Sequence, residues 1–311
     1  MTSISVIRDA RFLDHDPGRA HPESPSRLRA IDRALEASEL TLVELLARPA
    51  TREEIARVHD DGLIAAIERA RGRVAALDPD TRTSAGSVEA AELAAGSTIE
   101  LATRVAKGEA PPGIALVRPP GHHATRDRAM GFCLLNNVAI ATEALRAQGL
   151  AERIVIYDFD VHHGNGTESI FYEDPNVLYL STHQWPFYPG TGPKEATGVG
   201  KGEGATLNVP LPEGTDDETL LEVSRSVLIP AAESFSPDFV ILSAGFDPFY
   251  DDPLGGFRIT ERGFRELGLL WRDLAERRTG GKIAAALEGG YDLDGLGRSV
   301  VELLDGWSRG G

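Results

Sequence analysis

The segment 154-IVIYDFDVHHGNG-166 is an apolar run that passes directly into acidic and imidazole side chains. An apolar run without alternation is typical of a parallel strand that is buried on both faces. Three further stretches have the same form, and they are 114-IALVRPPGHHA-124, 239-FVILSAGFD-247 and 283-IAAALEGGY-291. In open α/β sheets, ligands bind beyond the carboxyl ends of the strands. These stretches therefore predict one active site assembled from separate parallel strands.

Strand-like and helix-like segments alternate along most of the chain. Apolar runs predict strands at 114–118, 154–159, 177–182, 206–210, 239–243 and 283–287. Helical patterns predict helices at 87–107, 134–148, 167–172, 216–234, 261–277 and 295–306. This alternation is typical of a three-layer α/β/α fold with a mostly parallel central sheet. Because no linker or repeat interrupts residues 1–311, we expect a single domain.

Short local signals add detail to this outline. Ser24 is expected to cap a helix whose first turn holds Pro25, with an apolar face that follows. Thr51 and Glu54 have the spacing of a capping box at the start of a second short helix. The Gly-rich stretch 189–204 lacks the lysine ending of a phosphate-binding loop, so we expect a surface loop there.

Composition restricts the class of protein. The formal net charge of −16 argues against binding of nucleic acid through a basic surface. No apolar run is long enough to span a membrane, and the N-terminal residues carry charges where a signal peptide would be apolar. The single cysteine, Cys133, cannot form an intramolecular disulfide, which suits a reducing compartment. We therefore expect a cytoplasmic protein that binds neither nucleic acid nor membrane.

The polar ends of two predicted strands hold candidate metal ligands. Asp158, Asp160 and His162 are spaced two apart, so on extended backbone their side chains share a face. Asp247, at the end of another strand, can complete a set of two Asp and one His. Three protein ligands leave a position open for water, which is the pattern of catalytic rather than structural zinc. The alternative is a group of solvated strand ends without a metal.

Two adjacent imidazoles, His122 and His123, follow a Pro-Pro-Gly turn. A buried imidazole beside a metal can act as general base and then as general acid. Asp158 and Asn165 are candidates to hold the far ring nitrogens. Tyr291 follows two glycines and could donate a hydrogen bond to a developing oxyanion. The alternatives are an exposed polar turn for the histidines and a packing role for the tyrosine.

Some loop residues could line a channel for an unbranched alkyl chain. Phe132 and Tyr188 are aromatic residues beside glycines, and Leu254 precedes two glycines. Ordinary packing is the alternative for all three, and His183 is expected to be structural.

Taken together, the motifs RPPGHHA, GFCLLNNVAIA, DFDVHHGNGT, STHQWPFYPGTG, LSAGFDP and LEGGYDL resemble those of the histone deacetylase superfamily. They occur in the family's order from about residue 20 to residue 300, and they are most similar to the bacterial group related to class II deacetylases and acetylpolyamine amidohydrolases. The resemblance implies the arginase/deacetylase fold. It also implies a zinc-dependent amidohydrolase that removes acetyl or similar short acyl groups from acetyl-lysine in proteins or related small substrates, with release of acetate.

The resemblance also implies roles for individual residues. It makes Asp160, His162 and Asp247 the ligands of zinc, although iron(II) can occupy such sites. His123 is then the general base and acid, His122 is its electrostatic neighbour, and Tyr291 polarises the carbonyl. Asp158 would orient His122, while the neutral Asn165, where many members have Asp, would lower the basicity of His123. The resemblance further implies a substrate channel lined by Gly131, Phe132, Tyr188, Leu254 and Gly289, with Asp80 as an acid at its rim. It implies an exit channel at Arg27. It also implies a structural potassium ion near Asp158, Asp160, His162 and Ser181.

Three alternatives to a protein deacetylase are left open. An acetylpolyamine amidohydrolase would use the same mechanism, although Leu254 stands where an acidic residue would favour a polyamine. A dimanganese ureohydrolase would need more carboxylates than the DFDVHH motif offers. A non-catalytic acetyl-ligand binding scaffold would be expected to lack a ligand or the tyrosine, and all are present. Oligomeric assembly is left open as well.

Overall fold

The computed structural model describes residues 2–310. Within these residues the centre is one sheet of eight strands, all parallel, in the order β2-β1-β3-β8-β7-β4-β5-β6. The strands are β1 (Ile4–Ile7), β2 (Leu42–Leu45), β3 (Gly113–Ala115), β4 (Ile154–Asp158), β5 (Val177–Gln184), β6 (Thr206–Leu211), β7 (Phe239–Ala244) and β8 (Ile283–Leu287). The four strands that carry the polar motifs, β3, β8, β7 and β4, are therefore immediate neighbours.

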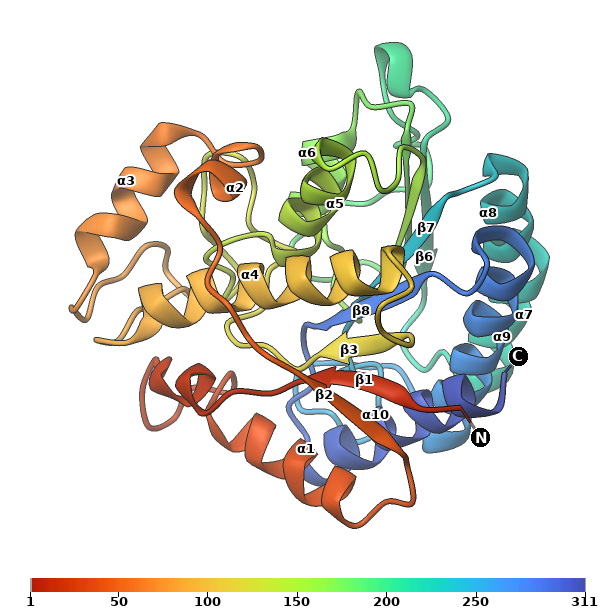
Figure 1. Cartoon of the computed structure of the whole chain (residues 1–311), viewed down its shortest axis with the longest axis horizontal. Coiled ribbons are helices and arrows are strands. Elements are labelled where there is room, and N and C mark those ends of the chain that lie inside the picture. Colours follow the sequence, from red (N-terminus) through yellow and green to blue (C-terminus); the bar gives the residue numbers. More distant parts are fainter. Residues whose placement is uncertain (1, 311) are drawn as a thin grey trace.

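Helices cover both faces of the sheet, which confirms the expected three layers. They are α1 (Ser26–Glu36), α2 (Arg52–Ala56), α3 (Asp61–Ala70), α4 (Ser87–Ala106), α5 (Asn137–Ala147), α6 (Asn165–Phe171), α7 (Asp217–Val223), α8 (Ile229–Phe235), α9 (Glu261–Thr279) and α10 (Leu293–Arg309). In Figure 1, α4 and α5 lie on one side of the strands, and α1 and α10 lie on the other. β4, β7 and β8 are completely buried between these layers, as their unbroken apolar runs require.

Several local predictions need correction. The edge strand β2 and its neighbour β1 were not predicted, because each has only four residues and β2 is largely half-exposed. The single helix expected at 216–234 is divided into α7 and α8 by a π-helical turn at Ser224–Leu228, and Pro230 lies just after it. Ser24 does not cap α1, since no side chain caps that helix. The capping box of Thr51 and Glu54 is confirmed, and 189–204 is a largely exposed loop.

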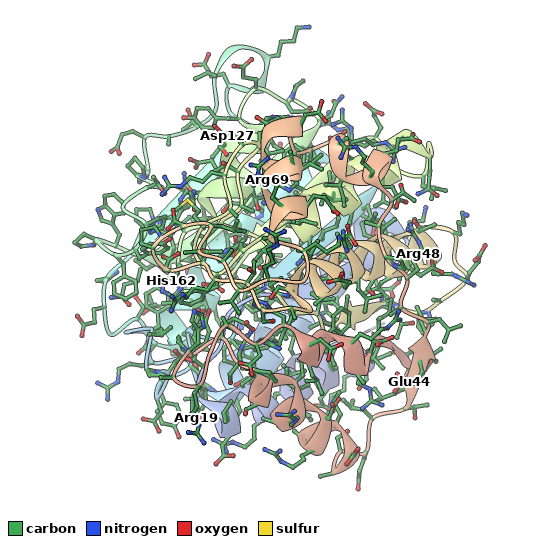
Figure 2. All side chains as sticks on the ribbon, turned by 90° about the vertical axis from the view of Figure 1, so that its left-hand side faces the viewer. Arg19, Glu44, Arg48, Arg69, Asp127 and His162 are labelled. Atoms are coloured by element: carbon green, nitrogen blue, oxygen red, sulfur yellow. The ribbon has the colours of Figure 1, made fainter. Side chains whose placement is uncertain are left out.

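The topology places the chemical residues at one edge of the sheet. β1 leads away from the N terminus toward the left in Figure 1, so the carboxyl ends of all the parallel strands lie on that side. Figure 2 faces this side and shows His162 on it, far from Glu44 of β2 in the same view. No described helix is both long and apolar enough to cross a membrane.

Candidate active site

Three candidate metal ligands converge beyond the ends of β4 and β7. One ligand atom each from Asp160, His162 and Asp247 lies within 4.8 Å of the others. His162 Nδ1 is 3.0 Å from Asp160 Oδ1 and 3.2 Å from Asp247 Oδ2. Both carboxylates are buried, whereas the His162 side chain is 12% exposed. Asp160 and Asp247 are therefore the two acids that could hold a metal ion together with His162.

The charges at this position favour a bound cation. Burial disfavours charge on His162, but Asp160 and Asp247 outweigh burial and raise the pKa of the imidazole to about 10. Burial and the charge of Asp160 also raise the pKa of Asp247 to about 7. Two buried carboxylates this close repel each other unless a positive charge lies between them. A divalent cation with two oxygen ligands and one nitrogen ligand therefore fits this set.

The backbone around the ligands fixes how they point. Asp247 Oδ1 accepts the N–H of Val161 at 2.9 Å, and Asp160 Oδ2 accepts the N–H of Gly289 at 2.9 Å. A Cβ atom at Gly289 would lie 2.1 Å from Asp247 Oδ2, so only glycine lets the β8 loop approach the ligands. Gly289, expected in the channel wall, lies instead against the ligand carboxylates and is not one of the cavity-lining residues.

The two adjacent histidines have different partners. His122 Nδ1 lies 3.0 Å from Asp158 Oδ2, and His123 Nδ1 lies 2.8 Å from Asn165 Oδ1. Burial disfavours charge on His122, but the charges of Asp158 and Asp160 outweigh burial and raise its pKa well above the usual value. Burial and the neighbouring His122 and His162 hold the pKa of His123 well below the usual value. His123 is therefore the neutral member of the pair, which is the form that accepts a proton.

Glu288 supports the turn that carries the histidines, and sequence reasoning did not identify it. Its Oε2 accepts the N–H groups of Gly121 at 2.6 Å and His122 at 3.1 Å, and Ser243 donates its hydroxyl to Oε1 at 2.7 Å. Glu288 is completely buried. A glutamate directly after the apolar run of β8 was the available signal, because a buried carboxyl needs such donors.

Tyr291 closes another side of the site. The guanidinium of Arg27 lies 5.0 Å from the centre of the Tyr291 ring. Arg27 also donates to the carbonyl oxygens of Gly290 at 2.6 Å and Glu288 at 2.5 Å, which holds the loop before the tyrosine. Burial, opposed by Arg27, raises the pKa of Tyr291 well above the usual value. The phenol therefore stays protonated and can donate a hydrogen bond.

A cavity of about 500 Å³ leads from the surface to these groups. Of the sequence-predicted residues, its lining includes Asp80, His123, Gly131, Phe132, His162, Tyr188, Leu254 and Tyr291. Asp80, the expected rim acid, accepts the N–H of Gly131 on Oδ1 at 3.0 Å. One of its two carboxylate oxygens therefore stabilises the cavity wall at Gly131. Phe132, which lines the cavity, has a φ of 67°, a left-handed backbone conformation that is strained for a residue other than glycine.

Aromatic rings narrow the inner part of the cavity. The Tyr188 ring stands edge-on to His123, with centroids 5.2 Å apart, and Phe187 stacks on His162 at 5.4 Å. Sequence reasoning missed Phe187, although it is next to Tyr188 in a quoted motif. It also missed Gln184, at the end of β5, and the loop residues Glu213 and Pro253 in the lining, because their approach to the cavity depends on the tertiary fold.

Other predicted residues lie behind the cavity. Ser181 is a buried residue of β5 whose hydroxyl is 2.9 Å from His183 Nδ1, and His183 Nε2 is 2.9 Å from the carbonyl oxygen of Gly192. These contacts are consistent with the structural role expected for His183. Arg27 is fully buried and is also bonded to Glu23 at 3.1 Å.

Comparisons with known proteins show the family of the chain. The family model of the histone deacetylase domain matches residues 21–307. A "Probable deacetylase" of Archaeoglobus fulgidus is 39% identical over 296 residues, covering 93% of this chain and 82% of that protein. A "Histone deacetylase-like amidohydrolase" of Pseudomonas aeruginosa is 38% identical over 295 residues, covering 92% and 77%.

A plant relative and a solved structure extend the similarity. "Histone deacetylase 10, chloroplastic" of Oryza sativa subsp. japonica is 41% identical over 326 residues, covering 96% of this chain and 73% of that protein. The crystal structure of the HDA15 HD domain superposes with a TM-score of 0.94 at 39% identity, covering 99% of this chain and 89% of that one. The chain therefore belongs to the histone deacetylase family, and it is a hydrolytic deacetylase of the amidohydrolase type.

Proposed function

We propose that residues 1–311 act as one catalytic domain that hydrolyses the acetyl amide of acetyl-lysine with the help of zinc held by Asp160, His162 and Asp247. The observation that carries this proposal is the position of this ligand set beside a cavity that His123 and Tyr291 also line. Iron(II) is the alternative metal, since the same donors suit it.

The proposed chemistry divides one hydrolysis among three groups. When bound, the divalent cation supplies Lewis acidity at the acetyl carbonyl and lowers the pKa of water at the site. His123 accepts a proton from the attacking water, and Tyr291 donates its phenol O–H toward the oxygen that gains negative charge. His123 then returns the proton to the nitrogen as the C–N bond breaks, so that acetate and a free amine leave. His122, held by Asp158, supplies positive charge beside these steps.

The walls of the cavity support a substrate with an apolar stem. Phe132 and Tyr188 flank the approach to His123, and Leu254 supplies no charge to its lining. An uncharged residue at position 254 favours acetyl-lysine over an acetylpolyamine, whose second amine would gain from a carboxylate there. The carboxylates of the lining belong instead to Asp80 and Glu213.

Two supporting assignments belong to the same proposal. We assign product exit to the buried region at Arg27. We assign a structural potassium ion to the region of Asp158, Asp160, His162 and Ser181. Potassium would add positive charge beside the buried carboxylate of Asp158, which pairs with His122 but has no lysine or arginine partner among the described residues. We also propose that the protein is cytoplasmic. Its substrates would be proteins that carry acetyl-lysine or small acetyl-lysine compounds.

A kinetic panel tests the function directly. Zinc-loaded protein is assayed with an acetyl-lysine peptide, acetylputrescine and acetylspermidine, and acetate release is measured, with Asp247→Ala as the blank for contaminating activity. We expect the peptide to have the highest kcat/KM. Turnover of polyamines alone would make the protein an acetylpolyamine amidohydrolase, and turnover of none would contradict catalysis on acetyl amines. Metal analysis should give one transition metal per chain, whereas two would favour the dimetal alternative.

Tyr291→Phe is expected to lower kcat by roughly a hundredfold or more, because one oxyanion donor is lost. The phenol acts mainly in the transition state, so KM should change much less than kcat. Steady-state kinetics of the zinc-loaded variant provide the measurement, and metal content should match the wild type. A variant that turns over at the wild-type rate would remove the oxyanion role.

Asn165→Asp is expected to move the acidic limb of the kcat/KM–pH profile to higher pH. A carboxylate beside Nδ1 stabilises the protonated ring and so raises the pKa of His123. Because the base must be unprotonated to act, activity then appears only at higher pH. Ser169→Asp adds the same charge at an exposed position of α6 and should shift the limb much less. A limb that stays in place or moves to lower pH would show that Asn165 does not partner the base.

A further inference from the structure

Asp252 is a buried carboxyl group in the loop that follows β7. It is 7% exposed, and none of the described Lys, Arg or His side chains forms an ion pair with it. Its neighbour in sequence, Asp251, is exposed. A buried carboxyl needs hydrogen-bond donors, and here they all come from the backbone.

The two oxygens of Asp252 connect two walls of the active site. Oδ2 accepts the N–H of Tyr291 at 2.6 Å and the N–H of Asp292 at 3.1 Å. Oδ1 accepts the N–H of Leu254 at 2.9 Å. Tyr291 and Leu254 both line the cavity, although they lie 37 positions apart in the sequence. Asp292 accepts the N–H of Gly295 at 2.6 Å and so caps α10.

The backbone before Tyr291 needs such a tether. Two glycines precede the tyrosine, and Gly290 has a φ of 117°, which other residues rarely adopt. The guanidinium of Arg27 lies 5.0 Å from the centre of the tyrosine ring, and the Phe132 ring stands edge-on to it with centroids 6.1 Å apart. Arg27 holds the carbonyl oxygens of Glu288 and Gly290 on one side of this loop. The 2.6 Å bond that the Tyr291 N–H donates to Asp252 Oδ2 holds the backbone of the tyrosine itself relative to the cavity.

We propose that Asp252 is a positioning residue that holds the phenol of Tyr291 at the reacting carbonyl and couples it to the Leu254 wall of the substrate channel. This inference rests on the role proposed above for Tyr291. Transition-state stabilisation by a hydrogen-bond donor depends on its placement, and a shift of about 1 Å can cost about a hundredfold in rate. Asp252 acts through Tyr291 and does not itself touch the substrate.

Asp252→Asn is the sharpest substitution, because it keeps the shape of the side chain. Both oxygens accept N–H groups, whereas an asparagine offers one oxygen and one NH₂ group. In one amide orientation the NH₂ faces the N–H groups of Tyr291 and Asp292, and in the other it faces the N–H of Leu254. Either orientation sets donor against donor, so the link between the two walls is broken.

The test is a double-mutant cycle on the full-length zinc-loaded protein with the acetyl-lysine peptide. Asp252→Asn alone should lower kcat by up to about a hundredfold, with a smaller change in KM. In the Tyr291→Phe background the same substitution should cause little further loss, because the donor that it positions is already absent. Asp251→Asn is the matched control and should have wild-type kinetics. A loss that is the same in both backgrounds would overturn the proposal.

A second measurement does not depend on turnover. Crystal structures of the zinc-loaded wild type and of Asp252→Asn should show a displaced Tyr291 phenol with Asp160, His162 and Asp247 in place. A phenol in an unchanged position would overturn the positioning role. If the wild type hydrolyses no acetyl amine but the phenol moves, the proposed function fails while the tether stands.

Discussion

Asp247→Ala is expected to abolish activity and to prevent retention of zinc. The variant would keep only Asp160 and His162, and two protein ligands do not hold zinc in a catalytic site. The substitution also removes the acceptor for the N–H of Val161, which lies 2.9 Å from Asp247 Oδ1. Asp247→Asn keeps an oxygen for that bond but removes the charge, so it separates loss of the ligand from local unfolding.

Two measurements test this prediction. One is the zinc content after dialysis, and the other is the thermal unfolding temperature with and without added zinc. Zinc at a hundred times its Kd stabilises a folded protein by about 2.7 kcal/mol, so the wild type should melt at a higher temperature with zinc. Neither Asp247 variant should show this shift, whereas Asp251→Ala, an exposed acid in the following loop, should behave like the wild type. Full zinc retention with normal turnover by Asp247→Ala would remove Asp247 from the ligand set.

His123→Ala is expected to lower kcat by roughly 10²- to 10⁴-fold, because general acid–base catalysis contributes that much. His122→Ala should lose less activity. The two rings lie 3.9 Å apart, but the neutral ring of His123 lines the cavity and the ring of His122 does not. His122 carries charge and supports its neighbour, so its loss leaves the proton acceptor in place.

Single-turnover rates and zinc content distinguish these roles. Both variants should bind zinc like the wild type, because neither ring belongs to the ligand set. Activity that depends more on His122 than on His123 would reverse the assignment. Loss of zinc from His123→Ala would instead show that the ring supports the metal site, and the general-base role would then lose its support.

The sequence by itself determined the kind of fold and most of the chemical residues. Long apolar runs that end in glycine or acidic residues predicted the buried parallel strands, and their bounds in β7 and β8 agree closely with the prediction. This works because the unbroken apolar pattern of a strand buried on both faces can be read from the few residues of that strand. The carboxyl-edge rule then placed the motifs together without knowledge of the strand order.

Only the tertiary structure decided how these motifs combine. The spacing of the residues alone did not decide which two acids join His162, and only the family resemblance named Asp160 and Asp247. In the structure, the strand order β8-β7-β4 brings Asp247 to His162 and Asp160 while Asp158 contacts His122. Asp252 and Glu288 could not be assigned either, because their partners are backbone N–H groups far along the chain. The sequence encodes which side chains can accept a hydrogen bond, whereas the packing of strands and loops decides which donors reach them.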